Sequence, residues 1–213
     1  MGMRKTRGWR LGLAFLCCLL ARTADAEGVL CSDRLPATEP ERLFCSGVAK
    51  SEMGDRTGAI SDLERARAMQ ADLPEMRLIL GIQYQFAGDY PKALAEYDSF
   101  LLSHPDRPLV WSNRAAVHLM LGDLAAARRD IDRALELEPN AALLRVNRLH
   151  VADKQGDGPT IIVDATWLLE RGPPKPEWLS LRGGALVKEN RYEEALRDAE
   201  WLVKLRPDAY SYF

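Results

Sequence analysis

The sequence repeats itself at one fixed period over most of its length. A Gly-Asp pair marks the period at Gly54-Asp55, Gly88-Asp89, Gly122-Asp123 and Gly156-Asp157, and Asn190-Arg191 occupies the next position in the series. A small alanine follows five positions after this pair begins, at Ala59, Ala93, Ala127 and Ala195, and a proline closes four of the units, at Pro105, Pro139, Pro173 and Pro207. A chain of this kind folds as similar units, each of which buries its apolar face against its neighbours.

Each unit is predicted to form two amphipathic helices joined at the Gly-Asp pair. In the third unit, apolar residues such as Ile131 and Leu135 recur at helical spacing and alternate with the polar pair Arg128 and Arg129. Glycine permits the positive φ that ends the first helix, and aspartate caps the start of the second. The spacing therefore predicts an all-α chain of helical hairpins.

Small residues seven positions before the turn predict a close approach of the two helices. Gly81 and Ala115 hold this position, and we expect Ala93 and Ala127 to lie opposite them. A bulky residue there would overpack the pair at a cost of about 1–3 kcal/mol.

This combination of period, turn, small residues and closing proline resembles the tetratricopeptide repeat family, whose unit is a helix-turn-helix of about 34 residues. The resemblance covers residues 40–209 and implies a right-handed superhelical solenoid of about five units. We expect these units at 40–73, 74–107, 108–141, 142–175 and 176–209. Thr38 and Glu41 have capping-box spacing at the start of the first unit. In the fourth unit Ile161 replaces the alanine and begins a β-branched run, so its second helix is expected to be displaced or shortened.

The stretch 1–26 has the features of a cleavable export signal. Basic residues including Arg4 and Arg10 precede an apolar run at 11–21, and Ala24-Asp25-Ala26 places small residues at a cleavage site. The run is shorter than the about 20 residues that span a membrane. We therefore expect a signal peptide at 1–26 and a secreted or periplasmic mature chain without a transmembrane segment, with a linker or cap at 27–39 and an aromatic tail at 210–213.

Two cysteines, Cys31 and Cys45, remain after the predicted signal. An exported chain with an even, closely spaced pair is typical of a disulfide. In the chain-entropy model such a loop stabilises by about 3 kcal/mol. Two unpaired thiols, one of them buried, are the alternative.

Composition and motifs exclude several functions. The formal net charge of −2 does not suit a polyanion ligand, so nucleic acid is not an expected partner. His104, His118 and His150 have no metal-motif spacing, and each glycine is explained by a turn or a helix contact rather than a phosphate loop. We expect no enzyme activity, no cofactor and no metal.

The resemblance implies a concave groove lined by the first helix of each unit. Its expected partner-binding residues are Leu78, Ile82, Gln85, Ser112, Asn113, Ala116, Val146, Asn147 and His150. This lining is mostly apolar and suits an amphipathic helix or an extended apolar peptide, with the two asparagines bonding to its backbone. The alternative is that the apolar residues pack against neighbouring units and that the asparagines bond across adjacent helices.

In chaperone-binding members of the family, basic residues and asparagines in this groove hold an acidic tail. The matching positions here carry Phe44, Val48, Ile79 and Leu109, and only Asn113 fits part of that pattern. A clamp for an acidic tail is therefore not expected.

Two tryptophans, Trp167 and Trp201, lie one repeat apart, at a position where the earlier units carry Arg65, Ser99 and Arg133. They predict either a secondary contact surface or an aromatic closure of the last unit. Together these features predict an exported adaptor that binds a protein or peptide. The alternative is a structural subunit of an envelope complex or homo-oligomer whose apolar surfaces are permanently buried.

Overall fold

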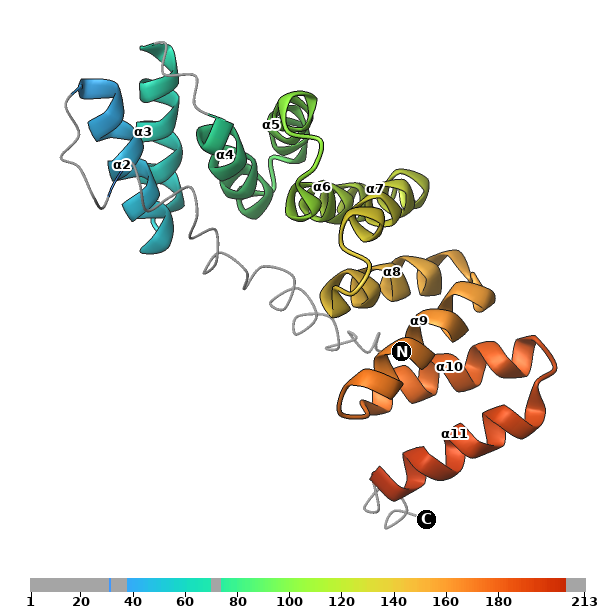
Figure 1. Cartoon of the computed structure of the whole chain (residues 1–213). Helices are drawn as coiled ribbons and strands as arrows, with labels where there is room; N and C mark the ends of the chain where they lie inside the picture. The colour runs from blue at the N-terminus through green and yellow to red at the C-terminus, as the bar shows by residue number, and fades with distance from the viewer. Residues whose placement is uncertain (1–30, 32–37, 70–73, 206–213) are drawn as a thin grey trace, which may run out of the picture. The chain divides into compact units, whose positions relative to one another are not determined.

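The computed structural model describes residues 31, 38–69 and 74–205, and all regular secondary structure in these ranges is helical (Figure 1). The helices are α2 (Glu39–Glu52), α3 (Arg56–Ala68), α4 (Pro74–Ala87), α5 (Tyr90–Ser103), α6 (Pro108–Leu121), α7 (Leu124–Leu137), α8 (Ala142–Gln155), α9 (Gly158–Arg171), α10 (Pro176–Lys188) and α11 (Tyr192–Leu205). From α5 onward, each helix begins one full repeat period after the equivalent helix of the preceding hairpin. The prediction of an all-α repeat fold is confirmed.

Some predicted segments fall outside these ranges. The predicted signal peptide 1–26 and aromatic tail 210–213 lie outside the described residues, and only Cys31, Thr38 and Glu39 of the predicted linker 27–39 are described. Within the described ranges, no helix has both the length and the apolar character needed to cross a membrane.

The turns within the hairpins follow the predicted chemistry. The four turn glycines have φ values of 70° to 82°, and Asn190, which takes the glycine position in the last hairpin, has φ 60°. Residues other than glycine rarely adopt this left-handed backbone conformation, and asparagine is among the few that tolerate it. At the next position, Asp55, Asp123 and Asp157 accept hydrogen bonds from backbone N–H groups in the first turn of the following helix.

The chain divides into two compact units, one ending at Ser103 and the other beginning at His104, where the sequence predicts one repeat domain over 40–209. The first unit contains α2 to α5, and the second contains α6 to α11. Each is described below by itself.

In the first unit, helices α4 and α5 pack closely at Gly81. A Cβ on Gly81 would lie 2.6 Å from Cε1 of the fully buried Tyr97, and none of the three nearest atoms belongs to Ala93. The predicted close approach is therefore present, but the tyrosine ring one turn further along α5 makes the nearest contact. Ring and glycine interlock because Tyr97 fills the space that a side chain at 81 would need.

The amino-terminal end of the first unit is held by a cap and a disulfide. Thr38 and Glu41 form the predicted capping box, in which the Thr38 hydroxyl accepts from the Glu41 N–H and the Glu41 carboxylate accepts from the Thr38 N–H. A disulfide joins Cys31 to Cys45 of α2, with Cα atoms 5.5 Å apart. The predicted bridge is confirmed.

In the second unit, α9 is a regular helix. It has 14 residues, as do α5 and α7, so the expectation of a displaced or shortened helix was wrong. Ile161 and Ile162 are buried in a cluster with Leu149, Leu179 and Leu186. The low helix propensity of β-branched residues costs only tenths of a kcal/mol each, and burying such side chains contributes more than that.

Candidate functional site

The first helices of the second unit were expected to line a binding surface. On α6 and α8, the Asn147 side-chain amide donates a hydrogen bond to the Ser112 hydroxyl at 3.0 Å, and both residues are buried. Asn147 therefore bonds across neighbouring helices, which is the alternative that the sequence left open. Ala116 is also buried on α6. These three residues form the inner layer of this surface rather than its exposed part.

Asn113, Val146 and His150 remain accessible on the same two helices. Asn113 and Val146 are half-buried, and Val146 rests partly on the apolar cluster below it. His150 is exposed, although the protein atoms around it still lower the pKa of its imidazole through desolvation. Protonation of this side chain is therefore disfavoured at neutral pH, and it presents a neutral ring.

The first unit supplies the remaining predicted residues, all on α4. Leu78 is buried, whereas Ile82 and Gln85 are half-buried. The Gln85 side-chain carbonyl accepts a hydrogen bond from the Tyr97 hydroxyl at 2.8 Å. A continuous wall running through both units stays a prediction.

Sequence reasoning missed a series of buried acids. One acidic side chain is buried at the same position of every repeat, namely Asp62, Glu96, Asp130, Asp164 and Asp198. In the last three hairpins, an arginine 16 residues earlier donates two hydrogen bonds to the acid, in the pairs Arg114–Asp130, Arg148–Asp164 and Arg182–Asp198. The recurrence of this Arg-to-Asp spacing in successive repeats was the available signal.

In the first unit, the buried acids have other partners. Lys50 and Ser46 donate to Asp62 at 2.5 and 2.6 Å, and Arg67 donates to Glu96. Hydrogen bonds from Lys50 and then from Ser46 hold the pKa of Asp62 below its usual value. Every one of these acids thus has a cationic partner, as burial of a charge requires.

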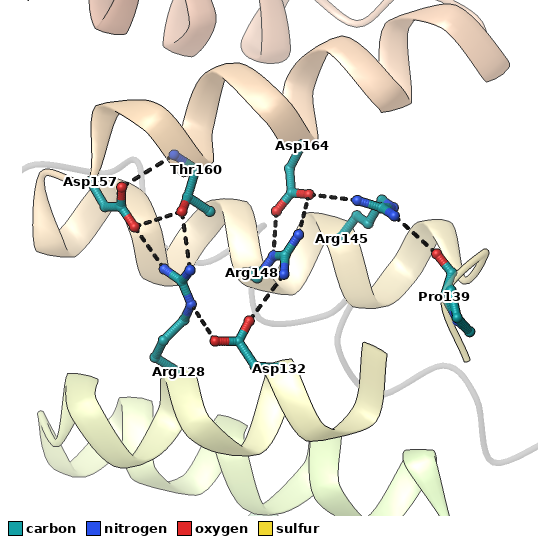
Figure 2. A network of polar contacts seen from close by, with 8 residues as sticks. All are labelled: Arg128, Asp132, Pro139, Arg145, Arg148, Asp157, Thr160 and Asp164. Carbon is teal, nitrogen blue, oxygen red and sulfur yellow. Dashed lines mark hydrogen bonds and ion pairs between the residues drawn. The ribbon is translucent and has the colours of Figure 1, made fainter. Parts of the chain in front are cut away.

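The pairs extend into a network across α7, α8 and α9 (Figure 2). Besides its two bonds to Asp164, Arg148 donates to Asp132 at 3.0 Å, and Arg145 donates to Asp164 and to the Pro139 carbonyl. Hydrogen bonds from Arg148 to Asp164 raise the pKa of the Arg148 guanidinium, so it stays charged. The network joins consecutive hairpins through ionic contacts, of which those between Asp164 and its two arginines have low exposure.

Arg128 of α7 forms the second half of this network. It donates to Asp132 and Asp157 at 2.7 and 2.8 Å and to the Thr160 hydroxyl at 3.1 Å (Figure 2). The Thr160 hydroxyl and then Arg128 lower the pKa of Asp157 through their hydrogen bonds. Arg128 thereby fills the junction between α7 and the start of α9.

The two tryptophans of the predicted secondary surface have different surroundings. Trp167 is half-buried, and the guanidinium carbons of Arg145 and Arg171 lie 4.5 and 4.7 Å from its ring centroid. Trp201 on α11 is 37% exposed. A joint surface formed by both rings stays a prediction, and Trp201 is the more accessible of the two.

No group of three or more His, Cys, Asp or Glu side chains that would suit a metal ion occurs in the described part of the chain. On α6 and α8, Asn113, Val146 and His150 together offer an amide, an aliphatic side chain and a neutral imidazole as accessible contact groups.

Comparisons with known proteins agree with this architecture. Residues 80–149 match the tetratricopeptide repeat family model. The chain is 27% identical over 176 residues to DnaJ homolog subfamily C member 3 of Mus musculus. This alignment covers 78% of this chain and 32% of the relative. It is 33% identical over 109 residues to TPR repeat-containing thioredoxin TTL4 of Arabidopsis thaliana, which covers 50% of this chain and 16% of the relative. The chain thus spans a third or less of these two relatives.

Solved structures resemble the chain over most of its length. MamA from Desulfovibrio magneticus matches with a TM-score of 0.68 at 16% identity, over 81% of this chain and 98% of that one. A tetratricopeptide repeat protein from Parabacteroides merdae matches with a TM-score of 0.68 at 21% identity, over 80% of this chain and 68% of that one. At 16% and 21% sequence identity, these structural similarities show a shared fold. Residues 80–149 thus match the tetratricopeptide repeat family, and the regularly repeated hairpins of the described residues form an all-α repeat solenoid of the same kind.

Proposed function

We propose that this protein is an exported adaptor that binds a protein or peptide segment on the surface formed by its first helices. The tetratricopeptide fold is a protein-interaction scaffold. The observation that carries the proposal is the layering on α6 and α8, where the buried Ser112–Asn147 bond lies beside accessible Asn113, Val146 and His150. A fixed inner layer with adaptable polar and apolar groups outside it suits a peptide ligand.

The first support for export comes from the sequence. The basic start, short apolar run and Ala24-Asp25-Ala26 of the predicted signal peptide support it. The Cys31–Cys45 disulfide adds support, because such bonds persist in oxidising compartments such as a bacterial periplasm.

One observation favours the alternative, a structural subunit of an envelope complex or homo-oligomer. Leu196 and Val203 of α11 are 60% and 40% exposed, whereas their equivalents in α9, Ile162 and Leu169, are buried. Packing by α10 covers the face of α9. A permanent partner that covered α11 in the same way would bury this apolar face.

A pair of matched variants tests the adaptor. Val146→Glu introduces a charge on α8, and Val163→Glu introduces the same charge at an exposed position of α9. We expect affinity capture from the native envelope to lose its specific partner with Val146→Glu and to keep it with Val163→Glu, while the circular dichroism of both variants stays helical. Equal capture by both folded variants would refute the assignment of this surface.

Light scattering separates the two functions. An adaptor with an open surface is expected to have the molar mass of a monomer. A homo-oligomeric mass that Leu196→Glu reduces to that of a monomer would instead support the structural subunit.

A further inference from the structure

A cavity of about 410 Å³ opens among α9, α10 and α11 in the second unit, and no residue of the predicted groove lines it. Leu186 of α10 and Ile162 of α9 supply apolar walls, while Glu194, Arg197 and Trp201 come from α11. Its size is at the lower end of the range for small-ligand sites. We call this cavity the α11 pocket.

The preceding junction shows why a pocket exists here. There, Arg128 of α7 reaches across to Asp157 and Thr160 at the start of α9 (Figure 2). One repeat later, Ile162 takes the place of Arg128, and Arg191 takes the place of Asp157. An aliphatic side chain cannot form those hydrogen bonds. In addition, Glu194 takes the place of Thr160, so that Arg191 pairs with Glu194 at this junction instead of an aspartate pairing with Arg128.

The charges in the α11 pocket leave one cation in excess. Arg182 donates two hydrogen bonds to Asp198 at 2.9 and 2.6 Å, and Arg191 donates two to Glu194 at 2.6 and 2.8 Å. The third lining arginine, Arg197, interacts electrostatically with Glu194 but forms no hydrogen bond or ion pair with another residue of the described ranges. A guanidinium without such a partner is available to a carboxylate, for which its planar fork is suited.

Glu189 also contributes to the field around Arg191, but it does not line the α11 pocket. Three lining arginines therefore face two lining carboxylates, Glu194 and Asp198. This excess charge selects an anionic group over a cationic or neutral one.

The apolar residues that line the pocket together with Arg197 further restrict the chemistry of the ligand. Trp201 is 37% exposed and lines the pocket with Leu186 and Ile162. Tryptophan at an accessible pocket edge offers a large contact area for an apolar or aromatic side chain. The combination suits a ligand that carries a carboxylate and an apolar group a few ångströms apart.

We propose that the α11 pocket binds an acidic segment of a protein partner, in which an aspartate or glutamate pairs with Arg197 and an adjacent apolar side chain packs on Trp201. This site is separate from the surface on α6 and α8. The α11 pocket would give the partner a second contact. That contact is acidic, whereas the segment expected on α6 and α8 is mostly apolar.

The test uses the full mature chain labelled with ¹⁵N and three probe peptides: acetyl-Phe-Glu-Phe-amide, its Gln counterpart and its Lys counterpart. The indole N–H resonance of Trp201 is the readout. We expect saturable shifts with the Glu peptide and weaker or no shifts with the other two. Equal shifts with the Gln peptide would overturn the proposal, as would equal shifts with inorganic phosphate, which would indicate a general anion site.

Matched variants locate the contact. Arg197→Gln is expected to weaken the Glu peptide about tenfold, because a charge-assisted hydrogen bond to a carboxylate is lost. Arg129→Gln removes an exposed arginine at the equivalent position two repeats earlier and is expected to leave the affinity within about twofold. Unchanged affinity in Arg197→Gln would refute the assignment.

Val146→Glu separates this proposal from the adaptor function. The variant is expected to leave the Glu peptide shifts intact even where it abolishes partner capture. Loss of peptide binding in Val146→Glu, with the helical signal preserved, would show that the peptide binds on α8 and would overturn the α11 pocket.

Discussion

Each hairpin buries one acidic side chain between its helices and pairs it with a cation. Asp164 is fully buried and accepts hydrogen bonds from two arginines, Arg145 and Arg148. Removing one member of a buried ionic cluster leaves the others charged without compensation. A single neutral substitution at this residue is therefore expected to have a large effect.

Asp164→Asn is expected to lower the free energy of unfolding by about 3–5 kcal/mol, because two low-exposure guanidinium groups lose their main acceptor. Asp132→Asn serves as the control, because Asp132 is more exposed than Asp164 and forms ion pairs with both Arg128 and Arg148. We expect a loss of about 1 kcal/mol there. Urea denaturation measures both, and equal losses would contradict the central role of Asp164.

Two helix glycines, Gly81 and Gly183, give opposite predictions for the same change. Gly81→Ala forces a Cβ against the Tyr97 ring and is expected to destabilise by about 1–3 kcal/mol. At Gly183 the nearest atom to a new Cβ is the Asp198 Cβ at 3.7 Å, an ordinary contact. Gly183→Ala should therefore stabilise by about 0.5–1 kcal/mol through helix propensity. Thermal unfolding of the two variants checks this, and shifts of the same sign would contradict it.

At the scale of the elements, the starts of α3, α5, α7 and α9 combine a left-handed glycine turn with an aspartate cap. Asp157 performs two functions at the start of α9, because it caps the helix and also pairs with Arg128. Asp157→Asn preserves a good cap while it removes the charge, so the substitution isolates the ion pair.

The effect of Asp157→Asn is expected to depend on pH. The pKa of Asp157 is lowered in the folded protein from 3.8, so the ionised form contributes stability above about pH 4 and loses it as the pH falls below that value. The variant is expected to be roughly 1–2 kcal/mol less stable at pH 7, with the difference shrinking below pH 4. Denaturation series at pH 7 and pH 3 measure this, and a constant difference would contradict it. Asp106→Asn, at an exposed loop position, controls for the substitution itself.

At the scale of the whole molecule, the covalent state of the chain reports where it folds. Protein isolated from its native cells is expected to begin at Glu27 and to contain no free thiol after denaturation, because the disulfide joins Cys31 to Cys45. Intact mass before and after alkylation measures both features. Reduction should lower the stability by about 3 kcal/mol. A chain that retains residues 1–26 would contradict cleavage, and two alkylated cysteines would contradict the bridge.

The repeat period, the hairpin turns and the caps could be predicted from the sequence because they depend on local contacts. A positive φ at Gly122, an N-cap at Asp123 and the capping box at Thr38 each involve residues at most four positions apart. Recurrence of such local signals in every repeat also indicated the helix starts. Stacking of equal hairpins followed from their common apolar faces.

Contacts between helices decided the remaining features. Asn147 is buried against Ser112, the Arg148–Asp164 pair forms across two helices, and the apolar face around Ile162 makes α9 a full-length helix. Each outcome depends on which side chains of the neighbouring helix lie opposite a given position once the two helices have packed. A constant period marks equivalent positions but does not specify those partners. The candidate site therefore divided into buried and accessible members only once the helices were packed.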